Sequence, residues 1–331
     1  MLRKVLLVVF ALAVLSSLTA GGGRQDSGVL LRLGITKTAQ DPQFLWYGRW
    51  AADVERATDG YIKVQMYPAE SLGRAADVVE MAFRGEAVIA DCDPAYLSTY
   101  VPDLSVVVAP YLMRNADDMF NLWNSNELQA LFAQLEERGL KVFTMNYEYP
   151  RLLWTQRPIN SRADVAGLRI RCAPSPMWNA VVETLGGNPT NIPQSETYQA
   201  LQQGVADGAE MIPSVVYSWR WYEVLKYATR TDHVIAHNLF AMSTDIYRSF
   251  PENVRRAFDE VNVRYMREYY ELSDAMQEEH IQMLKDLGVT FSDIDRTEFY
   301  RAALDVPRRF PEWSPGLYER FRAVLDAAAR R

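Results

Sequence analysis

Hydrophobic and polar residues follow strand-like and helix-like patterns in turn along the first half of the chain. Short apolar or alternating runs predict strands, and aromatic and apolar residues at steps of three or four predict helices. The predicted elements are strands at 29–35, 61–67 and 87–90 and helices at 44–57 and 75–83. This β-α-β-α-β order favours a mainly parallel sheet with helices on both faces, which binds ligands beyond the carboxyl ends of its strands.

A second unit of the same kind begins after Arg151. Its predicted elements are strands at 168–172 and 234–243 and helices at 176–185 and 196–203. From Pro251 to Leu287 the apolar residues recur at helical spacing, and Ser249 and Glu252 have the spacing of a capping box. A helix of this length measures about 55 Å, which is longer than one small domain is wide.

These patterns predict an α/β protein of two lobes that one long helix spans. We expect the N-terminal lobe to contain residues 29–150 plus roughly 238–265. The C-terminal lobe should contain residues 151–237 plus roughly 266–331. No low-complexity linker and no repeat of 20 to 50 residues interrupts the chain, so several crossing segments should join the lobes.

The first 23 residues have the pattern of a secretory signal peptide. Arg3 and Lys4 precede an apolar run at 5–15, and small residues follow it. The run is shorter than the roughly 20 residues that cross a bilayer, so the alternative of an uncleaved membrane anchor is disfavoured. We expect cleavage between Ala20 and Gly23 and export to the periplasm. Loss of Arg3 and Lys4 would take the formal net charge from −7 to −9.

The composition narrows the class of protein. The 331 residues are 49% hydrophobic and 23% charged, as in a globular protein, and the net negative charge argues against a nucleic-acid partner. Three histidines and two cysteines are few for a hydrolase or a metalloenzyme. Cys92 and Cys172 could pair in an oxidising compartment or remain two buried thiols, and we expect the reduced state.

Most candidate catalytic patterns are weak. His233 and His237 could share a zinc ion on a helix, but their apolar surroundings predict a strand, where they would be about 13 Å apart. His280 is expected to be solvated. Asp91 and Asp93 flank Cys92, and paired carboxylates can perform acid–base chemistry, but no partner group accompanies them. No nucleophile elbow, phosphate-binding loop or dinucleotide motif is present.

Arginines at predicted strand ends are the stronger candidates. Arg151 follows Tyr149-Pro150, and alternation puts Arg169 and Arg171 on the same face of one strand. A guanidinium group matches the geometry of a carboxylate, so two of them could hold an anionic ligand. The alternative is a surface arginine paired with a nearby acid.

Several motifs occur in the order seen in one family of transport proteins. They are YPAESLG at 67–73, APYL at 109–112, DVAGLRIR at 164–171, GGNP at 186–189, ETYQALQQG at 196–204, ADGAE at 206–210 and YEVLKY at 222–227. Together they resemble the solute-binding proteins of tripartite ATP-independent periplasmic (TRAP) transporters, of the dicarboxylate-binding (DctP) type. The resemblance implies a two-lobed periplasmic binding protein fold that closes on an organic acid and delivers it to membrane permease subunits.

The resemblance also implies site residues. Arg171 matches the arginine that forms a salt bridge to the ligand carboxylate, and Arg151 matches a second arginine. Asp93 and Tyr96 fall where the start of a helix contacts the ligand, and Thr36 falls at the end of the first strand.

The family's frequent asparagine is replaced by Met211, which could line an apolar wall instead. Glu210 matches a residue that, in a subset of the family, accompanies a metal ion bridging ligand and protein. A metal at Glu210 is therefore a weak candidate, and no other cofactor is expected. Phe44 and Trp154, with Tyr147 and Trp178, could add aromatic surface to the site or could pack in the core.

These observations predict a binding protein rather than an enzyme, acting as a monomer. The ligand is expected to be a small organic acid, whose identity the sequence does not give. One alternative is an exported enzyme that uses Asp91, Asp93 or Glu210 as a base. Another is a sensor with the same fold and a receptor as partner.

Overall fold

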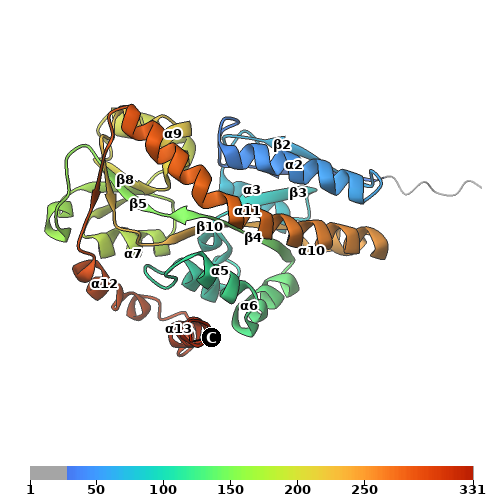
Figure 1. Cartoon of the computed structure of the whole chain (residues 1–331). Coiled ribbons are helices and arrows are strands. Elements are labelled where there is room, and N and C mark those ends of the chain that lie inside the picture. Colours follow the sequence, from blue (N-terminus) through green and yellow to red (C-terminus); the bar gives the residue numbers. More distant parts are fainter. Residues whose placement is uncertain (1–27, 331) are drawn as a thin grey trace, which may run out of the picture.

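The computed structural model describes residues 28–330 as two α/β lobes that lie side by side (Figure 1). The predicted signal peptide at 1–23 lies outside the described residues. Each lobe is built on one sheet flanked by helices, which confirms the predicted fold class. Among residues 28–330, no helix is both long enough and apolar enough to cross a membrane.

The N-terminal lobe contains a five-stranded sheet. Its strands, in spatial order, are β2 (Ile62–Tyr67), β1 (Val29–Gly34), β3 (Val88–Cys92), β10 (Ile235–Ser243) and β4 (Leu140–Pro150). Its helices are α2 (Pro42–Ala57), α3 (Ala75–Phe83), α4 (Pro94–Leu97), α5 (Ala116–Trp123), α6 (Asn126–Glu137) and α10 (Thr244–Ser249). The alternation of apolar and polar residues determines which face of β1 meets the core: Leu31 and Leu33 are fully buried, while Arg32 between them pairs with Glu86 at the surface.

The C-terminal lobe contains a six-stranded sheet. Its strands, in spatial order, are β11 (Thr290–Asp293), β9 (Tyr227–Arg230), β5 (Leu152–Thr155), β8 (Gly208–Met211), β6 (Arg169–Cys172) and β7 (Asn188–Asn191). Its helices are α7 (Pro176–Leu185), α8 (Thr197–Gln202), α9 (Pro213–Ser218) and α12 (Thr297–Ala303). Local sequence defines α7, where Ser175 caps the first turn, Pro176 starts it and Gly186 ends it at a left-handed φ of 95°.

One strand in each sheet runs against the others. Strand β10 is antiparallel to β3 and β4, and β5 is antiparallel to β8 and β9, whereas all other pairs are parallel. Both reversed strands directly follow a crossing of the chain between lobes, from β4 into β5 and from β9 into β10. The backbone N–H of Arg151 donates to the carbonyl of Val234 over 2.8 Å and so joins the two crossings.

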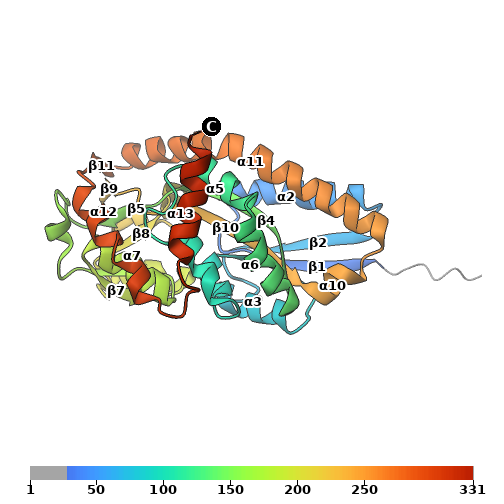
Figure 2. The same cartoon turned by 90° about the horizontal axis from the view of Figure 1, so that it is seen from below.

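Helix α11 (Glu252–Asp286) spans both lobes, as predicted (Figures 1 and 2). In its first half, Asn262 accepts a hydrogen bond from Trp50 of α2 at 2.8 Å. Further on, Gln277 exchanges two hydrogen bonds of 3.0 Å with Ser214 of α9. The predicted capping box is absent, because Ser249 ends α10 and donates to the carbonyl of Ile246 instead.

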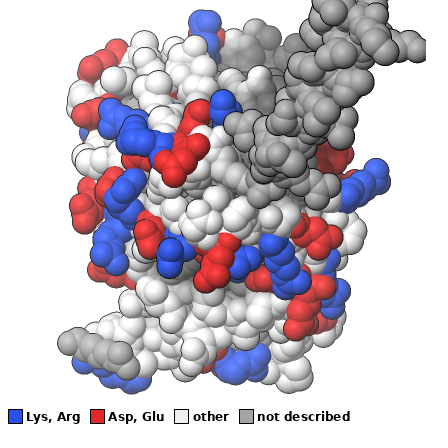
Figure 3. Space-filling view, turned by 90° about the vertical axis from the view of Figure 1, so that its right-hand side faces the viewer, with Lys and Arg blue, Asp and Glu red and all other residues white. Residues whose placement is uncertain are grey.

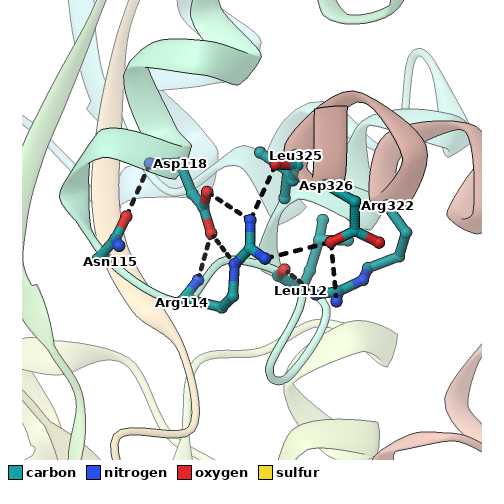
Figure 4. A network of polar contacts seen from close by, with 7 residues as sticks. All are labelled: Leu112, Arg114, Asn115, Asp118, Arg322, Leu325 and Asp326. Carbon is teal, nitrogen blue, oxygen red and sulfur yellow. Dashed lines mark hydrogen bonds and ion pairs between the residues drawn. The ribbon is translucent and has the colours of Figure 1, made fainter. Parts of the chain in front are cut away.

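The end of the chain returns to the N-terminal lobe, which differs from the predicted boundary at 266–331. Helix α13 (Leu317–Ala328) packs against α5 (Figure 2). Arg114 binds Asp118 through two nitrogens and also reaches Asp326 and the carbonyl of Leu325, while Arg322 donates to the carbonyl of Leu112 (Figure 4). The last helix therefore ties the C-terminal segment to the N-terminal lobe.

Candidate functional site

A cavity lies between the lobes, where the carboxyl ends of several strands meet. The cavity has a volume of about 50 Å³, which is small beside the roughly 300–1,000 Å³ that is usual for ligand pockets. The N-terminal lobe contributes Thr36, Lys37, Glu70, Ala75, Asp93, Tyr96, Glu148 and Asn238, and the C-terminal side contributes Arg151, Arg171, Ala173, Gln194, Met211 and Val215. Most of these follow or end a strand, which is the expected place for a ligand in an α/β sheet.

Arg171 offers an incompletely satisfied cation to this cavity. It occupies β6 near its carboxyl end and is 2% exposed. Its Nε donates to the carbonyl of Ile192 at 2.9 Å, and its guanidinium lies 5.4 Å from the ring centre of Trp221. One terminal nitrogen has no acceptor among residues 28–330, and none of their carboxylates forms an ion pair with Arg171.

Burial lowers the pKa of Arg171 from its usual value, because the charged form loses its hydration; the negative charge of Glu210 raises it in part. A guanidinium group nevertheless stays protonated in proteins. Arg171 is therefore a buried positive charge whose remaining N–H groups can be satisfied by an anion that enters the cavity.

Arg151, unlike Arg171, has a carboxylate partner within the protein. Its Nε and one terminal nitrogen bind the two carboxylate oxygens of Glu210, which is fully buried on β8, and its guanidinium stacks 4.2 Å from the ring centre of Trp178. Burial raises the pKa of Glu210, but the charge and hydrogen bonds of Arg151 outweigh it and lower that pKa overall. Nε2 of His233 lies 3.6 Å from the same carboxylate.

The N-terminal lobe contributes a third buried cation to the cavity. Nζ of Lys37 pairs with Glu148 and lies 3.5 Å from Oδ2 of Asp91. The other oxygen of Asp91 accepts hydrogen bonds from Tyr47 at 3.3 Å and from Asn238 at 2.9 Å. Burial lowers the pKa of Lys37, but the two carboxylates raise it well above its usual value, so the amine stays charged.

Asp93 and Tyr96 face the cavity from the start of α4. A side-chain oxygen of Asp93 accepts the backbone N–H of Ala95 at 2.8 Å and so caps that helix. Burial raises the pKa of Asp93 to about 6, while the charge of Arg151 opposes this rise. Asp93 therefore titrates near neutral pH inside a cavity that also holds two arginines.

The remaining candidates divide between the cavity and the core. Thr36 and Met211 line the cavity, and Met211 forms an apolar wall there with Ala173 and Val215. Phe44 and Trp154 do not line it: Phe44 packs in the N-terminal core, and Trp154 is fully buried, where its indole N–H donates to the carbonyl of Met211. Tyr147 and Trp178 are also not among the residues that line the cavity, and the ring of Trp178 lies against the guanidinium group of Arg151.

The two lobes touch each other at the mouth of the cavity. The side chain of Gln194 donates to the carbonyl of Thr36 at 3.0 Å, and the backbone N–H of Ser195 donates to Glu70 at 3.1 Å. Arg74 of the N-terminal lobe pairs with Glu196 of the C-terminal lobe. These contacts hold the two lobes together beside the cavity.

Glu210 and the three histidines are buried side chains. Both oxygens of Glu210 accept hydrogen bonds from Arg151, and no group of three His, Cys, Asp or Glu side chains within residues 28–330 is placed to hold an ion. Burial lowers the pKa of His237 to about 4. The expectation of a solvated His280 is wrong, because this side chain is 6% exposed and packs on Tyr217.

The two cysteines are unpaired and lie in different lobes. Cys92 ends β3 and Cys172 ends β6, and both are fully buried. Burial raises the pKa of both thiols, to about 12 for Cys172, which keeps them protonated and unreactive. The reduced state during activity stays a prediction.

Eight residues that line the cavity were not identified as site residues from the sequence: Lys37, Glu70, Ala75, Glu148, Ala173, Gln194, Val215 and Asn238. Glu148 and Asn238 are buried polar residues of strands β4 and β10, which also contain other polar residues. The strand sequences alone therefore do not distinguish these two positions as functional candidates.

Two lobes joined by crossing strands, with a cavity between them that presents a buried cation, define a ligand-binding protein of the periplasmic type. The sequence profile of the bacterial extracellular solute-binding proteins of family 7 matches residues 33–312. The chain belongs to this family.

Individual relatives agree with this assignment. The chain is 25% identical to a solute-binding protein of Chromohalobacter salexigens, covering 91% of this chain and 94% of that protein. It resembles the structure of a TRAP periplasmic solute-binding protein from Ochrobacterium anthropi with bound L-fuconate, with 29% identity, a TM-score of 0.87 and coverage of 90% and 99%. A TRAP solute-binding protein from Desulfovibrio salexigens in complex with diglycerolphosphate gives 26% identity, a TM-score of 0.88 and coverage of 92% and 98%.

Proposed function

We propose that this protein captures a small organic acid between its lobes and passes it, chemically unchanged, to the membrane permease of a TRAP transporter. The observation that carries the proposal is Arg171, which is buried in the cavity wall with an N–H group that no described residue accepts. A carboxylate would supply the missing acceptors through charge-assisted hydrogen bonds. The bound L-fuconate of the Ochrobacterium anthropi relative is an acid of this kind.

Binding is proposed to need neither a metal ion nor a catalytic group. Glu210, the candidate for metal binding and for a catalytic base, is already engaged through both oxygens by Arg151. The cavity contains both acidic and basic side chains and is not strongly positive. On the face of the protein shown in Figure 3, Lys and Arg are likewise interspersed with Asp and Glu. Capture of an anion therefore depends on the local placement of Arg171 and not on a field over the whole surface.

A thermal-shift screen of the purified protein tests this proposal. We expect small hydroxylated carboxylates to raise the unfolding temperature, because a ligand that binds only the folded state stabilises it by mass action. The same shift should occur after treatment with EDTA, and mass spectrometry of the released ligand should recover it unchanged. A chemically altered product, or a shift that requires a metal ion, would contradict the proposal.

Export and delivery need separate tests. N-terminal sequencing of protein from the periplasm should show that residues up to about Ala20–Gly23 are missing. Uptake of the radiolabelled ligand by cells should require both this protein and permease genes adjacent to its own. Uptake that persists without the permease would favour a sensory role for the same fold.

A further inference from the structure

The guanidinium group of Arg171 lies over the ring of Trp221. Its central carbon is 5.4 Å from the centre of that ring. Trp221 is fully buried and does not line the cavity, so any effect that it has on a ligand must pass through its neighbours. The face of an indole attracts a cation, and this attraction is stronger where water is excluded.

The local backbone turns Trp221 into the core. Directly before it, Arg220 adopts a left-handed φ of 61°, which is uncommon for a residue other than glycine. The side chain of Arg220 pairs with Glu223 at the surface, and a single 3₁₀ turn begins at Trp221. The indole thereby joins the apolar cluster that contains Ile192, whose backbone carbonyl accepts the hydrogen bond from Nε of Arg171.

Packing alone does not explain a tryptophan at this position. The indole N–H of Trp221 is buried, and no residue within 28–330 accepts a hydrogen bond from it. A buried donor without an acceptor costs free energy, which phenylalanine or leucine would avoid. Trp154 is equally buried, but its indole N–H donates to the carbonyl of Met211. What distinguishes Trp221 is therefore its ring, which attracts the cation of Arg171.

Arg171 has few other restraints on its position. Its Nε donates to the carbonyl of Ile192, and one terminal nitrogen has no acceptor in the part of the chain that the structure describes. A single hydrogen bond at Nε leaves the guanidinium group able to rotate, and the ring of Trp221 restricts that rotation. A long side chain that is ordered beforehand does not have to be ordered by the ligand, which strengthens binding.

We infer that Trp221 is a positioning residue, which holds the guanidinium group of Arg171 in place for an anion before the anion binds. The inference rests on the proposed function, because it takes Arg171 as the group that binds the carboxylate. Trp221 itself adds no contact to the ligand and no charge to the cavity. Its contribution to affinity is the preorganisation of Arg171.

The mobility of Arg171 in the ligand-free protein tests this role directly. Nitrogen-15 NMR relaxation gives the order parameter of the Nε–H bond on the picosecond-to-nanosecond timescale, and the variant Arg171→Lys identifies the signal. We expect a rigid Nε–H bond in the parent protein and in Trp221→Phe, which keeps an aromatic face, and a mobile one in Trp221→Leu. A rigid bond in Trp221→Leu would overturn the inference. So would equal mobility in the two variants, because the volume of the side chain and not its aromatic face would then hold Arg171.

Calorimetry with L-fuconate and L-galactonate measures the consequence for binding. Trp221→Leu should weaken binding by about threefold to tenfold, which corresponds to the cost of ordering one long side chain, and Trp221→Phe by less than about twofold. In an Arg171→Met background no guanidinium group remains to be held, so Trp221→Leu should cause no further loss. A further loss of the same size in that background would show that Trp221 does not act through Arg171.

Trp50→Leu is the matched control for loss of a buried indole. Trp50 is a buried tryptophan of the N-terminal core, and its ring packs on that of Phe240. Urea denaturation should find Trp50→Leu destabilised to an extent similar to Trp221→Leu, but its affinity and the mobility of Arg171 should match the parent protein. An equal loss of affinity in both variants would mean that general destabilisation is the cause.

These measurements separate the inference from the proposed function. If the two acids bind the parent protein and lose affinity in Arg171→Ala but not in Trp221→Leu, the inference is wrong and the proposed function stands. If Trp221→Leu mobilises Arg171 but no carboxylate binds the parent protein, the positioning contact stands and the proposed function is wrong.

Discussion

Arg151 and Arg171 are both buried in the wall of one cavity, but their surroundings give them different roles. Arg151 has a bidentate carboxylate partner in Glu210 and an aromatic ring beneath it. Arg171 has one backbone carbonyl and an aromatic ring, and no carboxylate of residues 28–330 neutralises it. The charge of Arg151 is already compensated within the protein, whereas the charge of Arg171 is available to a ligand.

Burial of an arginine therefore does not identify its role. Removing charges from water costs free energy, which an internal ion pair offsets in the empty protein and a ligand offsets only on binding. The ion pair of Arg151 therefore stabilises the empty protein, whereas the charge of Arg171 is neutralised only when an anion binds. Four predictions address this contrast, in order of decreasing effect.

Arg151→Ala should destabilise the protein by about 3–5 kcal/mol, because it leaves the fully buried Glu210 without its cation. Urea denaturation of the ligand-free protein measures this effect. The double variant Arg151→Met/Glu210→Met, which removes both charges, should recover most of the loss. A single variant as stable as the parent protein would show that Glu210 is compensated by another group.

Arg171→Ala should weaken binding of the organic acid by about 2–5 kcal/mol, since it removes the charge-assisted hydrogen bonds to the carboxylate. The free energy of unfolding without ligand should not fall, because no buried acid loses a partner and a buried charge without a carboxylate partner is removed. Arg169→Ala is the matched control on the same strand: Arg169 is exposed and pairs with Asp207, so calorimetry should find the parent affinity. Unchanged affinity in Arg171→Ala would disprove the assigned role.

Binding should tighten by about threefold to tenfold as the pH falls from 7.5 to 5, because Asp93 loses its negative charge beside the anionic ligand. The pKa of Asp93 is raised to about 6 in the folded protein, so protonation occurs within this window. The same shift makes the ionised carboxyl unfavourable for folding, so its contribution to stability decreases as the pH rises from about 4 to 6. Titration calorimetry on Asp93→Asn should show a flatter pH profile, and an identical profile would exclude Asp93 as the cause.

Arg74→Ala should speed ligand dissociation by about twofold to threefold, because it removes the exposed ion pair with Glu196 that joins the lobes at the mouth. Stopped-flow measurements should find a smaller difference at high salt, where exposed charges are screened. Arg84→Ala is the control, since Arg84 pairs with Glu80 within one lobe. Equal dissociation rates for the two variants would mean that the Arg74–Glu196 contact does not hold the closed form.

Local patterns predicted much of the fold. The periodicity of α11 and the alternation in β1 were readable because each depends on which face of one element meets the core. The return of α13 to the N-terminal lobe could not be predicted in this way, because its anchoring contacts, such as Arg114 with Asp326, join residues 212 positions apart. The capping box at residue 249 was wrong for a local reason, because Ser249 belongs to the preceding short helix.

Local patterns in the chain were enough to predict the two-lobed α/β class, the long helix and the candidate residues Arg151, Arg171, Asp93 and Tyr96, because strand ends, helix starts and family motifs are local properties. The ion pairs of the site appear only in the folded protein: Glu210 neutralises Arg151, Arg171 remains without a carboxylate among the described residues, and Lys37 pairs with Glu148. This is because the charge balance of a buried site depends on which side chains meet in space. Those partners, such as Lys37 and Glu148, lie on separate elements that only the folded sheet brings together.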